Sequence, residues 1–384
     1  MSQWPMVKLG DVCERKIPKW DRNGKKKYID ISTVSPETKK VESPQDVLGE
    51  DAPSRAQQII QTDDVLVSTV RPNLNAVAKI PSTFNGHIAS TGFCVLRATE
   101  KIDPGFLFHF VQTQAFIQQC INKSTGISYP STTANKIRAI QIPLPPLEEQ
   151  RRIASILGHS TLQNSIVNKT INKLNTARQG CIEKYVDDPS KTPRLDSLAD
   201  LQGGLSLGKT REVNPVEVEY LRVANIQRNN LILDNLKTIR CTEKELERCT
   251  IKDGDILMLE ANANPLEVGR AAVAKVGSRH LVFQNHLFRV RSTEVSPIVL
   301  NALLSSVSVR TQLLRLAKTT SGLNTMTISQ ARALRIPLRD ELTTKEFERQ
   351  LTRIEQQKKF LAEKQSLLEE LHQSLATRAF AGQL

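Results

Sequence analysis

Short runs of apolar residues, broken by Asn, Pro and Gly, begin each half of the chain. In the first half these runs are DVLVSTV, AVAKI and FCVLR, and in the second half they are DILML, RAAVAKV and HLFRVR. They are rich in β-branched residues, which predicts short β-strands. Near residues 106–121 and 299–317 the apolar positions instead recur every three or four residues, which predicts helices. Each half is therefore expected to form a β-rich module of mixed α and β structure.

A long polar stretch with a helical pattern follows each module. Glu148–Val186 comes directly after Pro145 and Pro146, and its first two glutamates suit the positive end of a helix dipole. In the second stretch Thr343 precedes Glu346 by three residues, which predicts a capping box at the helix start. A helix of about 39 residues is roughly 58 Å long, too long to be buried inside one module. We expect the two helices to form a spacer or a docking surface.

Apolar positions along these two helices alternate in steps of four and three, the spacing of a coiled coil. The apolar seam positions are Ile153, Leu157, Val167, Ile171, Leu174, Phe347, Leu351, Ile354, Leu361, Leu368 and Leu375. Polar residues interrupt the series at Asn164, Arg178, Lys358 and Gln365. We therefore expect the pair to bury too little by itself, so that helices of a partner complete the bundle.

The two halves are related by an internal repeat. Residues 137–144 read IRAIQIPL and residues 331–338 read ARALRIPL, at an offset of 194 residues that then holds without a gap. Earlier matches, such as AVAKI with AVAKV, keep the same order. A period of this length indicates two domain-sized units rather than a solenoid. We place the first module at 1–146, the first long helix at 147–188, the second module at 189–340 and the second long helix at 341–384.

Composition limits the class of protein. The chain has 384 residues, of which 39% are hydrophobic, enough for two or three globular domains. The start MSQWPMVKLG is no secretory signal and no apolar run could span a bilayer, so a cytoplasmic protein without a membrane partner is expected. Six cysteines form no CxxC pair and the histidines show no zinc-ligand spacing. We expect reduced thiols, no metal site and no cofactor.

The charge of the chain points to a partner. Its net charge is +13 and its pI is about 9.5. Because neutralised phosphates release their counterions, this balance favours a polyanion, nucleic acid first. The alternative is a basic surface without a specific partner.

Tandem β-rich modules that end in an IPLP-type strand, then LEEQRRIASIL and a long helix, with a second helix closing on LATRAFAGQL, resemble the DNA specificity subunits of type I restriction-modification systems. The resemblance covers the whole chain. It implies an α+β fold in which two target recognition domains are separated by two long antiparallel helices, a coiled-coil-like spacer with pseudo-twofold symmetry. It also implies a subunit that joins two methylation subunits and, for cleavage, two restriction translocase subunits. The second copy departs from the pattern, because RIPLRDELTTKEF replaces PLPPLEEQRRI.

The function expected from this resemblance is recognition of a bipartite, asymmetric target in double-stranded DNA, which directs adenine methylation and restriction by partner subunits. Each module would face the major groove of one half-site, about 34 Å from the other. The Asn/Asp-Pro-Pro-aromatic tetrapeptide of adenine methylation and a GxGxxG loop are both missing, so no catalytic residue is expected. Two alternatives stay open, a standalone DNA-binding regulator and a protein-only scaffold. Gel-shift assays with and without methylation subunits distinguish the specificity subunit, the standalone regulator and the scaffold.

One motif suggests a different function. Residues 203–210 read GGLSLGKT, which satisfies the phosphate-loop pattern G-x-x-x-x-G-K-[ST]. Such a loop follows a buried strand and opens a helix. Here the preceding SLADLQ is short and polar, and Asn214-Pro215 would interrupt a helix. We interpret the segment as a basic loop near DNA phosphates.

Base readout uses Arg for guanine and Asn or Gln for adenine, presented on loops. The first module offers STVRPNLN and NKSTGISYPS, and the second offers EANANPLEVGR and TSGLNTMT. His286 in FQNHLFRV is more typical of an ordinary strand residue, with base reading as the alternative. The candidate DNA-binding residues are Arg71, Asn73, Lys123, Ser124, Tyr129, Lys209, Arg211, Asn262, Asn264, Arg270, His286, Asn324 and Thr325.

Overall fold

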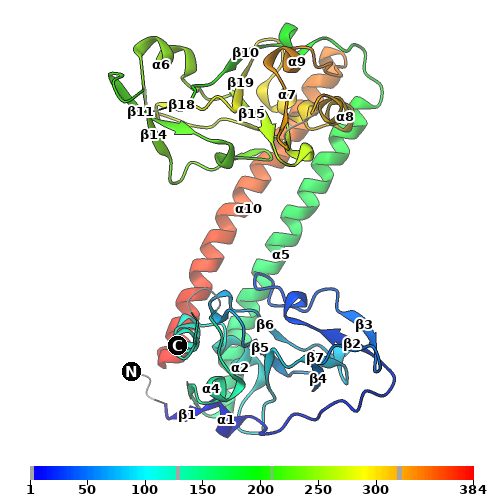
Figure 1. Ribbon diagram of the computed structural model, residues 1–384, viewed down its shortest axis with the longest axis vertical. Helices are drawn as coiled ribbons and strands as arrows, with labels where there is room; N and C mark the ends of the chain where they lie inside the picture. Colours follow the sequence, from blue (N-terminus) through cyan, green and yellow to red (C-terminus); the bar gives the residue numbers. More distant parts are fainter. Residues whose placement is uncertain (1–3, 127–129, 209–210, 318–321) are drawn as a thin grey trace. The chain divides into compact units, whose positions relative to one another are not determined.

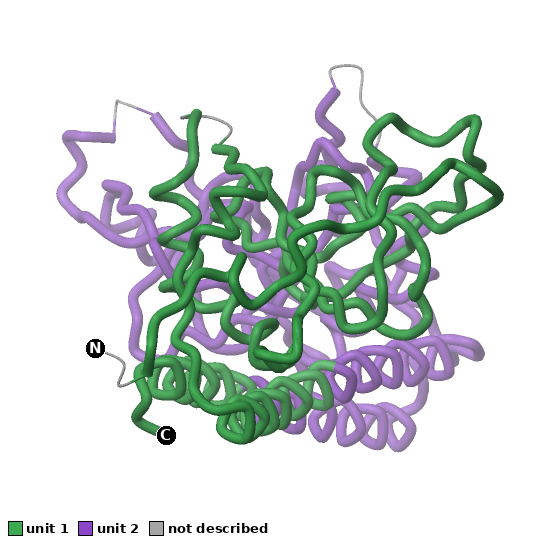
Figure 2. The backbone as a smooth tube through the Cα atoms, turned by 90° about the horizontal axis from the view of Figure 1, so that it is seen from below, with its two compact units in different colours: residues 1–168, 363–384 green, residues 169–362 purple. Residues whose placement is uncertain are grey.

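The computed structural model describes residues 4–126, 130–208, 211–317 and 322–384. The chain forms two compact units (Figure 2): unit 1 is Met1–Asn168 with Glu363–Leu384, and unit 2 is Lys169–Ala362. Two long helices, α5 (Leu147–Val186) and α10 (Glu341–Ala381), each contribute one part to each unit. Unit 1 is therefore assembled from two stretches of chain that lie far apart in the sequence.

Unit 1 contains two main sheets. One has the strand order β3-β2-β7-β4 and the other β6-β5-β8, while β1 pairs with β9. The β2–β7 pair is parallel and the other pairs are antiparallel. The elements (Figure 1) are β1 (Met6–Lys8), α1 (Leu9–Val12), β2 (Lys25–Ile29), η1 (Ile31–Thr33), β3 (Gln45–Leu48), β4 (Ala56–Ile59), β5 (Val65–Ser68), η2 (Pro72–Leu74), β6 (Val77–Lys79), η3 (Ser82–Phe84), β7 (Ile88–Ser90), β8 (Phe93–Leu96), α2 (Pro104–Phe110), α3 (Gln114–Asn122), α4 (Ala134–Arg138) and β9 (Gln141–Pro143).

Unit 2 repeats much of this plan. Its sheets have the orders β10-β19-β15-β17 and β14-β11-β18, with two short ribbons, β12-β13 and β16-β20. The β11–β18 pair is parallel, as β2–β7 is in unit 1. The elements are η4 (Leu195–Ser197), β10 (Ala199–Gly203), β11 (Val216–Leu221), η6 (Val223–Asn225), β12 (Ile226–Gln227), β13 (Asn230–Leu231), β14 (Lys237–Cys241), α6 (Glu243–Cys249), β15 (Ile256–Leu259), β16 (Ala261–Asn262), η7 (Pro265–Glu267), β17 (Ala271–Val273), β18 (Leu281–Phe283), β19 (Leu287–Ser292), α7 (Pro297–Leu304), α8 (Val307–Leu316), β20 (Asn324–Thr325) and α9 (Ile328–Arg332).

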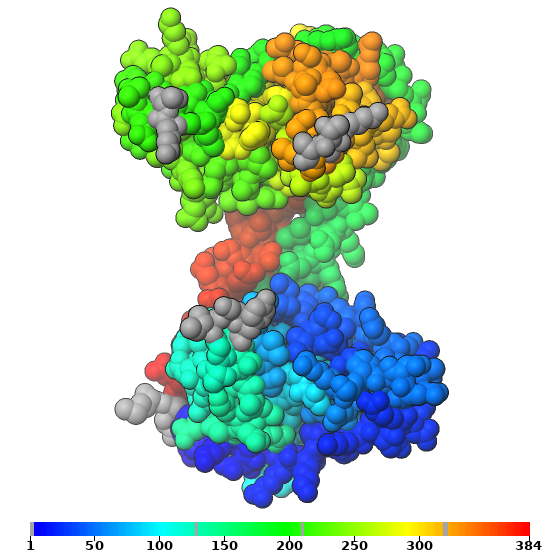
Figure 3. All heavy atoms as spheres, viewed as in Figure 1, coloured from blue at the N-terminus to red at the C-terminus, as the bar shows by residue number. Residues whose placement is uncertain are grey.

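The strands predicted from the apolar runs are confirmed as β5, β6 and β8 in unit 1 and β15, β17 and β19 in unit 2. The second sheet of each unit was not predicted. Its strands include β2, with sequence KKKYI, in which three lysines precede two apolar residues, and β11, with sequence VEVEYL, in which glutamates alternate with valines. The segment that carries β2 to β4 (blue) covers much of the face of unit 1 shown in Figure 3. The mixed α/β character of both modules is confirmed.

The single helical patch predicted in each module is two helices. Residues 106–121 fall in α2 and α3, and residues 299–317 fall in α7 and α8, which meet at 61°. The break has a local cause, because Thr113 and Ser306 each accept a hydrogen bond from a backbone amide three residues later and so start a new helix. The spacing of apolar residues continues across the break, so the sequence pattern could not reveal where the first helix ends.

In unit 1 the start of α5 and the end of α10 share a core with α2. Ile153 and Leu157 of α5 belong to the same apolar cluster as Ala379 of α10. The ring of Phe380 lies against Phe106 of α2, with centroids 5.0 Å apart. Early residues of one long helix thus pack with late residues of the other, which makes the two helices antiparallel here.

In unit 2 the end of α5 packs with the start of α10. Tyr185 stacks on Phe347 at 4.2 Å between ring centroids, and Arg178 forms an ion pair with Glu355 at 3.2 Å. The numbers rise along α5 while they fall along α10, so the helices are antiparallel in this unit too. Every apolar seam position is buried or half-buried.

The predicted capping box at Thr343 is wrong. Helix α10 begins two residues earlier, at Glu341, and its cap is Asp340. The carboxylate of Asp340 accepts hydrogen bonds from the amide of Thr343 (2.9 Å) and from its hydroxyl (2.6 Å). Glu346 instead contacts Arg349 and Gln350 in the next turn. Asp precedes Thr343 by three residues, so the same capping spacing occurs one turn earlier.

Two further expectations concern membranes and thiols. No single helix in the described part of the chain is long and apolar enough to cross a bilayer, whereas the bent pair α7–α8 has that length and composition. All six cysteines are free, and five of them are buried. Burial raises the pKa of Cys13 and of Cys94 to about 12, which suits inert thiols.

Acid is expected to destabilise unit 1 through His109 of α2, which is 7% exposed and lies near His372 of α10. Burial, and then the charge of His372, lowers the pKa of His109 from 6.5 to about 4. The pKa of His109 is lower in the folded chain than in the unfolded chain, so protonation favours unfolding. The free energy of unfolding is therefore unaffected above pH 6.5 and falls as the pH drops towards 4, by about 3 kcal/mol at most. Both tryptophans, Trp4 and Trp20, lie in unit 1, so denaturant unfolding followed by tryptophan fluorescence between pH 4 and 7 measures this loss.

His109→Gln should remove most of that slope, and His159→Gln, which changes an exposed histidine of α5 in the same unit, should keep it. An equal slope in all three chains would exclude His109 as the source.

Candidate nucleic-acid interface

In unit 1 the two predicted reading loops lie side by side. Val70 pairs with Ser131 as an isolated antiparallel bridge. The amide of Arg71 donates to the carbonyl of Pro130 at 2.8 Å, and the amide of Thr132 donates to Thr69 at 2.8 Å. The loop after β5 is therefore joined by its backbone to the segment just before α4.

Unit 2 repeats this arrangement with different side chains. β16 and β20 pair antiparallel, with Ala261 opposite Thr325 and Asn262 opposite Asn324. The amide of Met326 also donates to the carbonyl of Glu260 at 3.0 Å. The loop after β15 is thus joined to the segment before α9, as its counterpart is in unit 1.

Arg71 and Asn73 are exposed at the tip of the first of these loops. Arg71 has φ 47° and ψ 59°, a left-handed conformation, immediately before Pro72 opens the 3₁₀ helix η2. This conformation costs a non-glycine residue roughly 1–2 kcal/mol. Strain of this kind gathers at functional sites, since surrounding structure must hold it. The fixed turn determines where the arginine side chain starts.

The other candidates of unit 1 differ in availability. Lys123 is exposed at the end of α3. The hydroxyl of Ser124 donates to the carbonyl of Cys120 at 2.8 Å, so it is used inside the fold. Tyr129 lies outside the described residues, as does Lys209 of unit 2. Asn73 and Lys123 are therefore the better placed of these polar groups for a ligand.

In unit 2 the asparagines mostly shape the loops. Asn262 accepts from the amide of Asn264 at 2.9 Å, and Asn264 accepts from Leu266 at 3.0 Å. The amide of Asn324 donates to the carbonyl of Ala263 at 2.9 Å. Thr325, by contrast, is exposed. Base contacts by the three asparagines would use their remaining donors and acceptors.

The arginine candidates of unit 2 are paired with glutamates. Arg270 contacts Glu267 at 2.6 Å with its side chain 13% exposed, and Arg211 contacts Glu245 at 2.9 Å with 17% exposed. A base contact by either would first have to break an ion pair. His286 is more open, with its side chain 49% exposed and 3.7 Å from a carboxylate oxygen of Glu260. Burial raises the pKa of that carboxyl group.

Sequence reasoning missed an exposed leucine at the same place in both loops. Leu74 is 50% exposed at the end of η2, and Leu266 is 55% exposed within η7. Apolar side chains read the methyl group of thymine or wedge between base steps. The similar tripeptides PNL (72–74) and NPL (264–266), at corresponding positions of the two loops, could have indicated these leucines.

The GGLSLGKT segment has one feature of a phosphate loop that the sequence did not predict. A strand does precede it, because β10 pairs with β19. Gly204 is needed there, since a Cβ would come within 2.4 Å of the backbone oxygen of Phe283. After the motif the described residues from Arg211 to Pro215 form a turn that leads into strand β11, not an α-helix. The helix N-terminus that would bind phosphate is therefore not formed by the described residues after the motif.

No group of three or more His, Cys, Asp or Glu side chains in the described ranges could hold a metal ion. The charged side chains of the two loop pairs are Arg, Lys, His and a few paired glutamates, which suit hydrogen bonding to bases and phosphates.

Residues 1–176 match the family described as the type I restriction modification DNA specificity domain. The specificity subunit of the type I restriction enzyme EcoKI from Escherichia coli (strain K12) is 25% identical over 70% of this chain, and the match covers only 62% of that subunit. The StySPI specificity subunit from Salmonella potsdam is 22% identical over 86% of this chain and 76% of its own length. A solved structure on complex assembly and conformational transition of the type I R-M system has a chain with a TM-score of 0.61 and 25% identity, covering 99% of this chain and 98% of that one.

Proposed function

We infer the function of this chain from its family, the type I restriction-modification DNA specificity proteins, to which it belongs. We propose that it is the subunit that recognises a bipartite, asymmetric DNA target for such a complex. Adenine methylation, and cleavage where a restriction subunit is present, are then carried out by partner subunits. The chain itself supplies recognition and no catalytic group.

The observation that carries this proposal is the recurrence of one loop pair in both units. The same backbone pairing joins residues 69–71 to 130–132 in unit 1 and 260–262 to 324–326 in unit 2. A repeated frame with different side chains on it is what two half-sites of different sequence require. Arg and Asn at these tips have the donor and acceptor patterns for guanine and adenine. The net charge of +13 supports phosphate contacts that hold each unit in register.

Partner binding is proposed for the outer faces of the long helices. Several large apolar side chains outside the seam are exposed there: Leu162 (54%), Ile166 (47%), Phe360 (65%), Leu367 (66%) and Leu371 (50%). Leu367 and Leu371 are four residues apart, so they lie on one face of the part of α10 that belongs to unit 1. Helices of two methylation subunits would cover these faces and complete the bundle, as the polar seam positions also suggest.

The proposal is tested by the adenine methylation pattern of DNA from cells that carry the chain and its partner subunits. We expect methylation at one bipartite sequence, which disappears when the chain is deleted. Methylation that persists without the chain, or a chain that binds the sequence alone and regulates transcription, would contradict the proposed role.

Arg71→Ala is expected to weaken recognition of one half-site only. If Arg71 makes a bidentate contact to guanine, its loss costs about 1–3 kcal/mol and relaxes one base position. Arg15→Ala, which removes the same charge from another exposed position of unit 1, is the control. Binding of the assembled methylation complex to a library of half-site variants distinguishes the two. A uniform loss over all sequences in the Arg71 variant would indicate a phosphate contact instead.

A further inference from the structure

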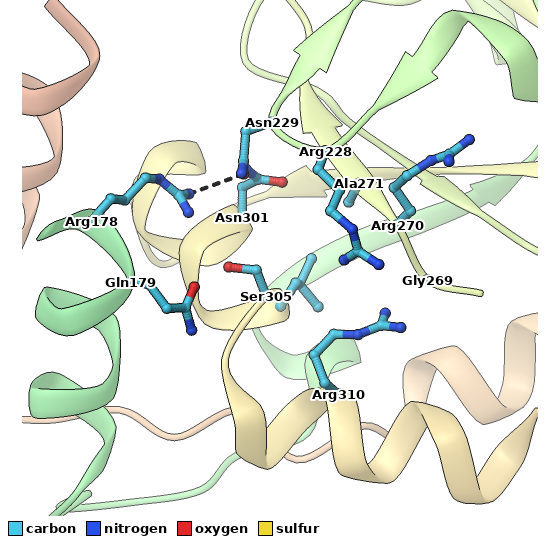
Figure 4. Close-up of a pocket in the computed structure, with 11 residues that line it drawn as sticks. Arg178, Gln179, Arg228, Asn229, Gly269, Arg270, Ala271, Asn301, Ser305 and Arg310 are labelled. Carbon is cyan, nitrogen blue, oxygen red and sulfur yellow. Dashed lines mark hydrogen bonds between the residues drawn. The ribbon is translucent and has the colours of Figure 1, made fainter. Parts of the chain in front are cut away.

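Unit 2 contains a polar cavity that the proposed DNA contacts do not use. Its volume is about 110 Å³, space for a group the size of several water molecules. Arg178 and Gln179 of α5 lie on one side of it, and Arg228 and Arg310 lie on the other (Figure 4). Arg270 also lines it. No acidic side chain does so among the described residues.

A chain of hydrogen bonds fixes the orientation of two side-chain amides in the cavity wall, the half-buried Asn229 and the buried Asn301. Arg178 can only donate, so the atom of Asn229 that it contacts at 3.0 Å must be the side-chain oxygen. The same oxygen accepts from the side-chain nitrogen of Asn301 at 2.9 Å. The side-chain oxygen of Asn301, a residue only 4% exposed, is then the outward acceptor, and it has no partner among the described residues. A ligand here must therefore donate a hydrogen bond as well as carry negative charge.

Positive charge exceeds negative charge around the cavity. Glu267 is shared between Arg228 (2.8 Å) and Arg270 (2.6 Å). Arg310 contacts backbone carbonyls and no carboxylate within the described ranges. Burial, and then the charge of Arg228, lowers the pKa of Arg310. An anion in the cavity would relieve this repulsion.

Two further carboxylates lie near the Arg178 side. Glu355 pairs with Arg178 and also with Lys358. Glu183 is hydrogen-bonded to the side chain of Gln179. Neither of them contacts Arg228, Arg270 or Arg310, so the excess positive charge is concentrated on the opposite side of the cavity.

The corresponding place in unit 1 is built differently. The register of β5 with β6 and of β15 with β17 makes Asn75 the counterpart of Gly269, so the match of AVAKI with AVAKV expected from the sequence is wrong by two residues. The matching hairpins make Lys39 the counterpart of Asn229. In unit 1 the ammonium group of Lys39 donates to the carbonyl and the side-chain oxygen of Asn75, at 2.7 and 2.8 Å. In unit 2 these two positions are occupied by Asn229 and Gly269, so the lysine and its asparagine partner are both missing there. The repeat thus supplies an internal cation in one copy and an arginine-lined space in the other.

We propose that this cavity binds a hydrogen phosphate group, either as inorganic phosphate or as the end of a phosphomonoester. Its oxygens would accept from the arginines, and its O–H would donate to the side-chain oxygen of Asn301. Sulfate at neutral pH and a DNA phosphodiester carry no such proton. The site is therefore distinct in chemistry from the contacts to the DNA backbone, and it offers unit 2 a small-molecule ligand.

The test is calorimetric titration of the full chain with inorganic phosphate, sulfate and adenosine 5′-monophosphate in separate experiments. We expect phosphate to saturate one site. Sulfate should bind at least about tenfold more weakly than phosphate, because the buried side-chain oxygen of Asn301 would face another hydrogen-bond acceptor. Adenosine monophosphate that displaces phosphate identifies a phosphomonoester as a ligand, and failure to displace it identifies free phosphate.

Arg310→Gln is expected to weaken phosphate binding about tenfold, through loss of a charge-assisted contact. Arg315→Gln makes the same change at an exposed position of the same helix, α8, and should leave binding unchanged. If Arg310→Gln does not fold, as judged by circular dichroism, Asn301→Asp is the second variant. It is nearly isosteric and its carboxylate repels phosphate, so binding should be lost. Absence of saturable phosphate binding, or equal binding of sulfate, would overturn the proposal.

Discussion

A chain that carries Leu367→Glu and Leu371→Glu together is expected to fold and to lose binding to the methylation subunits that we propose as its partners. Both leucines are exposed on one face of α10, in the part of the helix that belongs to unit 1. Burying a leucine at an interface stabilises it by about 1.5–3 kcal/mol. A carboxylate at the same place must instead be desolvated. The two changes should therefore weaken assembly more than about 100-fold.

Co-purification and light scattering of the chain with its methylation subunits measure this loss. Ser366→Glu with Gln373→Glu is the matched control, because it adds the same two charges at exposed polar positions of the same helix. Equal loss in both variants would mean that negative charge, and not the apolar face, weakens the complex. No loss in either would exclude this face as the docking surface.

Asp64→Ala is expected to destabilise unit 1 by about 3–5 kcal/mol, because the buried Arg97 loses its hydrogen-bonded carboxylate and keeps only the half-exposed Glu14, 4.0 Å away. Asp64 is 1% exposed and accepts two hydrogen bonds from Arg97, both at 2.8 Å. It also accepts from the amide of Gln61 at 2.7 Å. Tryptophan fluorescence during denaturant unfolding reports on this unit, since Trp4 and Trp20 both belong to it.

The repeat supplies a matched variant in unit 2. Asp255 contacts Arg291 through the same two atoms, at 2.7 and 2.8 Å, and accepts from the amide of Lys252. The side chain of Arg291 is 34% exposed, whereas that of Arg97 is 9% exposed. Because water can solvate Arg291 once its carboxylate is removed, Asp255→Ala should lower the free energy of unfolding by roughly half as much as Asp64→Ala does. Denaturant unfolding followed by circular dichroism measures this loss. A larger loss from Asp255→Ala would show that burial does not decide the cost.

Sequence patterns predicted the elements whose signal is local. The strands β5 and β15 and both long helices follow from runs and spacings of neighbouring residues. The strands β2 and β11 were missed because charged residues interrupt their apolar positions and because they are stabilised by parallel pairing with strands about 60 residues later. The start of α10 was misplaced because Asp340 and Thr343 both have capping side chains and only the fold selects between them.

The candidate site was predicted in part for the same reason. The four loops could be located from their Arg and Asn residues, and their pairing within each unit agrees with the repeat. The ion pair of Arg270 with Glu267 was not anticipated, since it depends on the turn that η7 makes. The cavity in unit 2 depends on side chains from α5, α8 and a hairpin. Such long-range groupings leave no trace in local spacing.

The interrupted make-up of unit 1 has a consequence for biosynthesis. Ala379 and Phe380 pack in the core of this unit with residues of its first 168, and all of Lys169–Ala362 lies between them. During synthesis the N-terminal part of unit 1 therefore leaves the ribosome early, but its core stays incomplete. Unit 2 is continuous in sequence, so it can fold as soon as Ala362 has left the ribosome. Meanwhile the face of Phe106 that later meets Phe380 stays uncovered. A nascent chain of this kind should engage a chaperone until translation of the last turns of α10 closes the core.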